Sequence, residues 1–298
     1  MRARSPASPL AWQVGDVSIT RIVESETTLP ISLLLPAATA VGLGPHREWL
    51  QPHFIDDEDH IRISFHSLVI ESAGKIIVVD TCIGEHGDPF APEASGTIGF
   101  LEDLADAGYP RETVDVVLCT HLHYDHVGWN TMKVNGAWQP TFPNARYLFA
   151  QAEYAHWQKE TGSPFTGNFD AAVRVVFDAG LADLVTTDHR ITEAVRLLPT
   201  PGHSPGHVSV LIRSRGESAL ITGDMTHHPV QWAEPGWSLP MVDFDESLGT
   251  QTRRRMAAEY ANSGTLVIGT HYPTPTAGHL VETAGMTRFV TPPEREHS

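Results

Sequence analysis

The chain has 298 residues, of which 41% are apolar and 19% are charged, a composition typical of a globular protein with a sizeable core. Its formal net charge of −16 argues against a nucleic-acid partner, because binding a phosphate backbone requires a basic surface. No apolar run approaches the ~18 residues needed to span a bilayer, and none near the N-terminus has the length of a signal peptide. We therefore expect a cytoplasmic protein that acts on a small molecule and binds neither nucleic acid nor membrane; the sequence leaves a homodimer open.

The two cysteines and the densest basic cluster both have structural interpretations. Cys82 and Cys119 are too few for a disulfide framework and follow apolar runs, so we expect small buried thiols. Arg253, Arg254 and Arg255 are consecutive within a helical pattern. We expect these three side chains to form the solvated face of that helix.

Strand patterns dominate the first half of the chain. Residues 16–25 alternate apolar and polar side chains, which predicts a half-exposed strand. Two further apolar runs flank Ala73-Gly74, a pair that indicates a hairpin turn. The other expected elements of this half are strands at 64–72, 75–81, 114–120 and 145–150 and helices at 99–108, 151–160 and 168–184.

The second half has the same alternation of strands and helices, which predicts an α/β protein built in layers. We expect a single domain over residues 1–298. Residues 29–60 are proline-rich and irregular; they form either an insertion packed over a site or a surface arm. The expected elements of this half are strands at 195–203, 207–214, 218–224 and 265–271 and a helix at 245–262.

The segment "THLHYDH" concentrates potential metal ligands in a few positions. His121, His123, Asp125 and His126 fit the pattern His-x-His-x-Asp-His. The preceding strand is expected to end near Thr120, which places all four side chains on a loop. A loop can turn them toward one point, whereas a strand would alternate them between its faces. Neutral imidazole is the commonest metal ligand in proteins, so the loop predicts a metal site.

More polar clusters stand at the ends of later strands. "PTPGHSPGH" contains His203 and His207, "ITGD" contains Asp224, and "VIGTH" contains His271. Each follows an apolar run and a turn with glycine or proline. Several strands are therefore expected to deliver ligands to one edge of the sheets. His207 is expected to have a structural role.

Together these segments resemble the five signature elements of the metallo-β-lactamase superfamily, which occur here in order. They are Asp80 in "VVDT", the "THLHYDH" loop, and His203, Asp224 and His271 in the segments above. The resemblance covers roughly residues 14–280 and implies a four-layer αββα sandwich with a binuclear site at one edge. It implies a first ion held by His121, His123 and His203, a second held by Asp125, His126 and His271, Asp224 as the bridge, and Asp80 as an orienting group.

The donor set suits Zn²⁺, which takes imidazole and carboxylate ligands and keeps an open position in catalytic sites. The same nitrogen and oxygen donors also accept Mn²⁺, Co²⁺ or Fe²⁺. Two such ions can share one hydroxide and stabilise both the attacked oxygen and the leaving oxygen. We therefore expect two divalent ions and a hydrolase.

Residue detail narrows the choice among branches of the superfamily. Acyl-homoserine lactone lactonases share the ligand set but have tyrosine three residues after the bridging aspartate, where this chain has His227. The segments "GDMTHHPVQW" and "HYPTPTAGHL" resemble the methyl parathion hydrolase branch more closely. A β-lactamase is disfavoured because Asp224 occupies the bridging position. A glyoxalase II-like thioesterase is disfavoured because its basic helical domain is not evident after His271.

We interpret the chain as a binuclear metal-dependent hydrolase that cleaves lactones or carboxylic esters by attack of a metal-bound hydroxide. In this interpretation Asp125 or Asp224 relays the proton, and His227 donates a hydrogen bond to the substrate oxygen. The alternative is a phosphotriesterase that uses the same nucleophile on phosphorus. A non-catalytic metal-binding protein is disfavoured, because no ligand of the set is missing.

Overall fold

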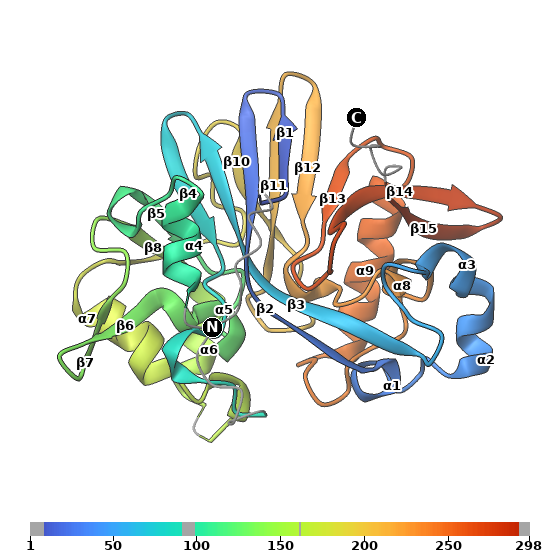
Figure 1. The fold of residues 1–298 in the computed structure, drawn as a ribbon, viewed down its shortest axis with the longest axis horizontal. Coiled ribbons are helices and arrows are strands. Elements are labelled where there is room, and N and C mark those ends of the chain that lie inside the picture. Colours follow the sequence, from blue (N-terminus) through green and yellow to red (C-terminus); the bar gives the residue numbers. More distant parts are fainter. Residues whose placement is uncertain (1–8, 91–98, 161, 292–298) are drawn as a thin grey trace.

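The computed structural model describes residues 9–90, 99–160 and 162–291. The expectation that no signal peptide is present rested on N-terminal residues that lie mostly outside these ranges. Two large mixed β-sheets pack face to face, with helices on both outer sides (Figure 1). No helix in the described ranges is long and apolar enough to cross a membrane.

The first sheet has seven strands and carries the first half of the chain. Strands β4, β5, β8 and β9 pair in parallel, and β1 to β4 pair antiparallel. The hairpin predicted around Ala73-Gly74 is confirmed by the pairing of β3 with β4. In order across the sheet, the strands are β1 (Ala11–Val14), β2 (Val17–Pro30), β3 (His60–Ser72), β4 (Lys75–Val79), β5 (Val116–Leu118), β8 (Arg146–Ala150) and β9 (Ala182–Val185).

The second sheet has six strands and carries the second half. Only β12 and β13 pair in parallel there. A separate hairpin joins β6 (Thr131–Val134) to β7 (Ala137–Pro140). In order, the strands of the second sheet are β10 (Val195–Pro199), β11 (Val208–Ser214), β12 (Glu217–Ile221), β13 (Leu266–Ile268), β14 (Ala277–Thr283) and β15 (Met286–Val290).

Helices cover the outer faces of both sheets (Figure 1). Helices α4, α6 and α7 lie on the side of the first sheet, and α8 and α9 lie on the side of the second. The long helix α9 begins at a cap in which the Asp245 carboxylate accepts the Leu248 N–H at 2.8 Å. The bounds are α1 (Ile31–Leu34), α2 (Ala40–Leu43), α3 (Arg47–Leu50), α4 (Phe100–Asp106), α5 (Tyr124–Val127), α6 (Gln151–Trp157), α7 (Val175–Asp178), α8 (Val230–Ala233) and α9 (Glu246–Tyr260).

Three apolar layers separate the four layers of secondary structure. Alternate residues of a strand face opposite sides of its sheet, so Leu68 and Ile70 of β3 pack between the two sheets while Val69 packs under the helices. The continuous apolar run of β5 follows the same rule: Val116 faces the other sheet and Val117 faces the helices. The expected αββα sandwich is confirmed.

Residues 29–60, here called the arm, are less irregular than expected. They contain the short helices α1, α2 and α3. Apolar side chains of the arm, including Ile31, Leu35 and Phe54, pack in the same cluster as α8 and α9. The arm is therefore an integral part of the outer layer and not a loosely attached loop.

Two expectations about helices are wrong. The helix expected at 168–184 is shorter, because a π-turn at Asp170–Arg174 leads into α7 and Gly180 ends the helical segment with a φ of 72°; β9 then occupies Ala182–Val185. Arg253 does not lie on a solvated face, since its side chain is 1% exposed. Arg254 and Arg255 are exposed, as expected. Cys82 and Cys119 are free and buried, also as expected.

Candidate metal centre

The predicted ligands meet at one edge of the sandwich, where several strands end. Asp80 follows β4 and the His-x-His-x-Asp-His loop follows β5 in the first sheet. His203 follows β10, Asp224 follows β12 and His271 follows β13 in the second sheet. Each sheet thus contributes ligands to the same place.

The first group contains His121, His123 and His203, whose ligand atoms lie within 4.8 Å of one another. Nε2 of His203 is 3.2 Å from Nε2 of His121 and 3.1 Å from Nδ1 of His123. All three rings are buried. His123 therefore presents a different ring nitrogen from the other two, a detail that spacing alone does not predict.

The second group contains Asp125, His126 and His271, also within 4.8 Å of one another. Oδ2 of Asp125 is 3.6 Å from Nε2 of both histidines. Asp125 is the most exposed of the set, with 12% of its side chain accessible. This group therefore opens toward solvent on its carboxylate side.

Asp224 lies between the two groups. Its Oδ2 is 3.1 Å from Nε2 of His271 and 3.2 Å from Nε2 of His126. The same oxygen is 3.5 Å from Nε2 of His203 and 3.9 Å from Nε2 of His121. The residues of both groups therefore converge on one carboxylate, as a bridging ligand requires.

The residues fit divalent metal ions. Nε2 of His126 and Oδ1 of Asp224 are buried and have no hydrogen-bond partner among the described residues, which is costly unless another species satisfies them. Burial, followed by the neighbouring histidines, lowers the pKa of His121 and His123 well below the usual value. These rings are therefore neutral at physiological pH, as metal coordination requires.

A further set of residues orients the ligand rings from behind. The Asp80 carboxylate accepts the His126 Nδ1–H at 2.9 Å and the Thr120 backbone N–H at 2.7 Å. The backbone carbonyl of Ser64 accepts the Nδ1–H of His271 at 3.1 Å. Such contacts fix which nitrogen of each ring faces the metal. Asp80 was predicted for this role, whereas the Ser64 carbonyl was not.

Glu153 joins the two loops that carry the first group, and no sequence pattern singled it out. Its side chain on α6 is buried and accepts four hydrogen bonds. Two come from the backbone N–H groups of Leu122, at 3.2 Å, and Gly206, at 2.7 Å. A third comes from the Ser204 hydroxyl at 2.8 Å. Leu122 lies between His121 and His123, and Ser204 and Gly206 follow His203 in its loop. The buried Glu153 carboxylate therefore links the loop of His121 and His123 to the loop of His203.

His207 and His227 lie outside the two groups described above, although the ligand atom of His227 is within 4.8 Å of those of His203 and Asp224. His207 accepts the Asp224 backbone N–H at 2.8 Å through Nε2 and donates to the Thr200 carbonyl through Nδ1. Burial lowers its pKa to about 3. His207 therefore supports the Asp224 loop, as expected. His227 places Nε2 3.0 Å from Oδ2 of Asp224, and its buried Nδ1 has no hydrogen-bond partner among the described residues.

A pocket of about 430 Å³ opens onto the second group. His123, Asp125, Asp224, His227 and His271 form its floor. None of the described lining residues is a lysine, an arginine or a tryptophan. The apolar wall comes from the arm, β3 and two loops, and includes Leu33, Leu34, Phe65, Phe165, Met241 and Val242.

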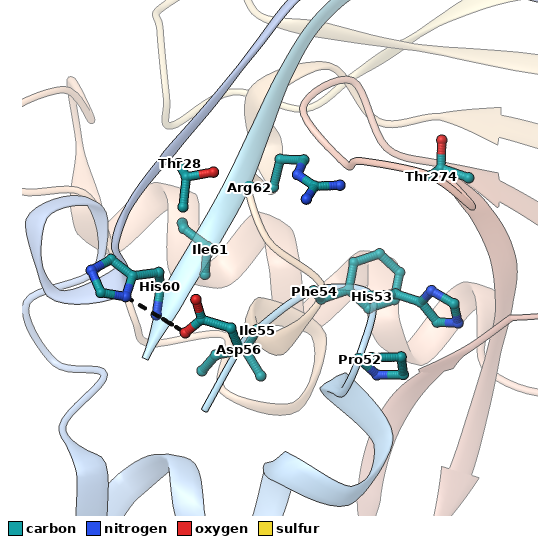
Figure 2. A pocket seen from close by; sticks show the side chains of 10 residues that line it. All are labelled: Thr28, Pro52, His53, Phe54, Ile55, Asp56, His60, Ile61, Arg62 and Thr274. Atoms are coloured by element: carbon teal, nitrogen blue, oxygen red, sulfur yellow. Dashed lines mark hydrogen bonds and ion pairs between the residues drawn. The ribbon is translucent and has the colours of Figure 1, made fainter. Parts of the chain in front are cut away.

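A smaller cavity of about 150 Å³ lies between the arm and the start of β3 (Figure 2). Asp56, His60 and Arg62 are its charged and titratable side chains, together with His53. The Asp56 carboxylate accepts the backbone N–H of His60 at 2.8 Å. Its lining contains none of the predicted ligands, so it belongs to the folding of the arm and not to the metal centre.

The sequence profile of the metallo-beta-lactamase superfamily matches residues 66–258, and the chain belongs to this superfamily. An N-acyl homoserine lactonase of Bacillus cereus is 28% identical over 156 residues, which are 51% of this chain and 54% of that protein. The match thus spans about half the length of that relative.

Two solved structures share the fold over nearly the whole chain. A hydrolase of the beta lactamase superfamily, AbOPH, is 24% identical with a TM-score of 0.78, covering 98% of this chain and 100% of its own. The dizinc quorum-quenching lactonase AidC, solved with a homoserine product, is 17% identical with a TM-score of 0.79, covering 97% of this chain and 99% of its own. At these identities the likeness establishes the fold alone.

Proposed function

We propose that the protein is a binuclear metal-dependent hydrolase of lactones or carboxylic esters. The observation that carries the proposal is the largely apolar pocket that opens directly onto the ligand groups. A pocket without a described lysine or arginine suits a neutral substrate with apolar substituents better than a phosphorylated or carboxylated one. The N-acyl homoserine lactonases among the relatives support the same substrate class.

Zinc is the ion that we propose for both positions, because histidine-rich sites with carboxylates suit it. When bound, two such ions supply an activated water nucleophile and polarise the carbonyl oxygen of the substrate. The chain itself contributes the orientation of the ligand side chains. Asp224 lies close to histidines of both groups, and the histidines are buried.

Three residues are proposed to act on the substrate. Asp125 lies at the open side of the second group and lines the pocket, where its carboxylate can take up or return a proton. Asp224 shares this role and would hold both ions, which would supply the nucleophile between the groups. His227 also lines the pocket, and we propose that it hydrogen-bonds the substrate oxygen.

The deciding experiment is a hydrolysis screen of the metal-reconstituted protein. The substrates are a lactone series, aryl esters, thioesters, phosphotriesters and a β-lactam, and kcat/KM is compared among them. We expect lactones or esters to give the highest values. Turnover of a phosphotriester alone, above ~10⁴ M⁻¹s⁻¹, would instead establish the phosphotriesterase alternative.

Two variants test the assigned roles. Asp224→Ala should abolish turnover and lower the metal content. His227→Ala should lower kcat by ~10²–10³, the usual cost of losing one donor to a transition state, while both ions remain bound. A parallel fall in metal content and rate for His227→Ala would mean that this ring only supports the ligand loop.

A further inference from the structure

Asp243 lies behind the first ligand group, on a part of the chain that contains none of the superfamily's signature elements. Its Oδ1 is 3.0 Å from Nδ1 of His203, and both side chains are at most 1% exposed. A carboxylate accepts hydrogen bonds and an imidazole nitrogen can donate one. The contact therefore places the ring proton of His203 on Nδ1 and leaves Nε2, which faces His121 and His123, free as a ligand.

The backbone next to Asp243 is hydrogen-bonded to the loop that carries His203. The N–H of Phe244 donates to the His203 carbonyl at 3.0 Å, and the N–H of Asp245 donates to the Gly202 carbonyl at 2.8 Å. The hydroxyl of Thr252 on α9 donates to the Pro201 carbonyl at 2.6 Å. The start of α9 and the His203 loop therefore form one rigid unit, so the distance between the Asp243 carboxylate and the ring is fixed.

Arg253 supplies a positive charge next to the Asp243 carboxylate. Its guanidinium is buried, with Nη1 3.8 Å from Oδ2 of Asp243. Nε donates to the Pro235 carbonyl at 2.7 Å and Nη1 donates to the Met225 carbonyl at 3.3 Å. A buried carboxylate needs such a partner, because burying an unpaired charge is very costly. Met225 directly follows Asp224, so the same guanidinium also contacts the loop of the bridging residue.

We propose that Asp243, backed by Arg253, is a positioning residue for the first metal ion: it fixes the tautomer of His203 and strengthens Nε2 as a ligand. Asp80 has the matching contact with His126 in the second group. Each group then contains one histidine backed by a buried carboxylate, and the two carboxylates come from different halves of the chain. This inference rests on the proposed metal centre.

The test measures metal affinity, not only turnover. Asp243→Asn keeps the shape of the side chain and an acceptor oxygen but removes its charge. Zinc dissociation constants for both sites are measured by competition with a chromophoric chelator, and His203→Ala identifies which constant belongs to the first ion. Loss of an orienting partner typically costs ~10–100-fold in metal affinity. In Asp243→Asn we expect this loss of zinc affinity at the same site that His203→Ala affects. The dissociation constant of the other site should not change.

Matched controls separate this role from a general loss of structure. Asp245→Asn changes a neighbouring carboxylate and keeps the cap of α9, since asparagine caps helices as well as aspartate does; both constants should stay at wild-type values. Arg254→Met should likewise have no effect, whereas Arg253→Met should weaken the first site. If Asp243→Asn does not fold because Arg253 is left unpaired, the double variant Asp243→Asn/Arg253→Met removes both charges and should show the same selective loss.

Two results would overturn the inference. One is unchanged affinity at both sites in Asp243→Asn. The other is an equal loss of zinc affinity at both sites, accompanied by a lower unfolding midpoint of the metal-free protein. Either result leaves the proposed function intact if the wild type binds two ions and hydrolyses its substrates, whereas a wild type that binds no metal contradicts the proposed function itself.

Discussion

Acid should weaken the fold through His228, which joins the segment carrying Asp224 to the arm. Its ring is 1% exposed. The Nε2–H donates to the Phe54 carbonyl at 2.8 Å, and Nδ1 accepts the Val230 N–H at 3.2 Å. Both nitrogens are satisfied in the neutral ring, so protonation would place a second N–H against the Val230 donor. Burial lowers the pKa of His228 to about 4.

The size of the effect follows from linkage between protonation and folding. A histidine in the unfolded chain has a pKa of about 6.5, so between pH 6.5 and 4 the unfolded chain binds a proton that folded His228 does not. The stabilisation is therefore complete above pH 6.5 and is lost as the pH falls, at about 1.4 kcal/mol per pH unit. Lowering the pH from 7.5 to 5.0 should remove about 2 kcal/mol through this one ring.

His228→Gln isolates this contribution, because glutamine retains an amide donor for Phe54 and does not titrate. The free energy of unfolding is measured by urea denaturation at pH 7.5 and 5.0 on metal-free protein, so that the ligand histidines titrate alike in both proteins. The stability difference between wild type and variant should change by about 2 kcal/mol between the two pH values. The same difference at both pH values would refute the reasoning.

Three further outcomes are expected. Gly206→Ala should lower both metal affinity and the unfolding midpoint, because the added Cβ would lie 2.3 Å from the Glu153 backbone nitrogen and α6 would have to shift; wild-type values of both would contradict the described loop contact. Leu34→Asp should lower kcat/KM for lactones with apolar acyl chains by roughly tenfold, since part of the ~1.5–3 kcal/mol from burying a leucine is lost, and metal content should not change. Cys82 and Cys119 should react with iodoacetamide only after denaturation, because burial raises the pKa of both thiols; mass spectrometry of native protein checks this.

Local spacing was sufficient to predict which side chains come together at the edge of the sheets. The loop from His121 to His126 is contiguous, and His203, Asp224 and His271 each stand directly after an apolar strand. Such patterns involve residues only a few positions apart, so they can be recognised in the sequence alone. A layered α/β architecture followed from the alternation of strands and helices, whereas the four-layer αββα sandwich was implied by the resemblance to the superfamily.

The supporting residues depend on contacts between distant parts of the chain and were missed. Glu153 occupies an ordinary position in an amphipathic helix, and only the folded structure shows that it is buried against Gly206. Asp243 is 40 residues from His203 and belongs to no motif. Arg253 was expected in solvent because two more arginines follow it, although the helical turn directs only those two outward.

The division of the ligands between the two sheets makes each proposed ion a cross-link. His121 and His203 are 82 residues apart in the chain, and a bond that closes so long a loop removes much of the freedom of the unfolded chain. Because the groups form only in the folded state, ion binding adds directly to the free energy of unfolding. Chelation should therefore act on this protein much as reduction acts on a disulfide-bonded one. During synthesis, the first group becomes complete once His203 has emerged, and the second must wait for His271 after β13.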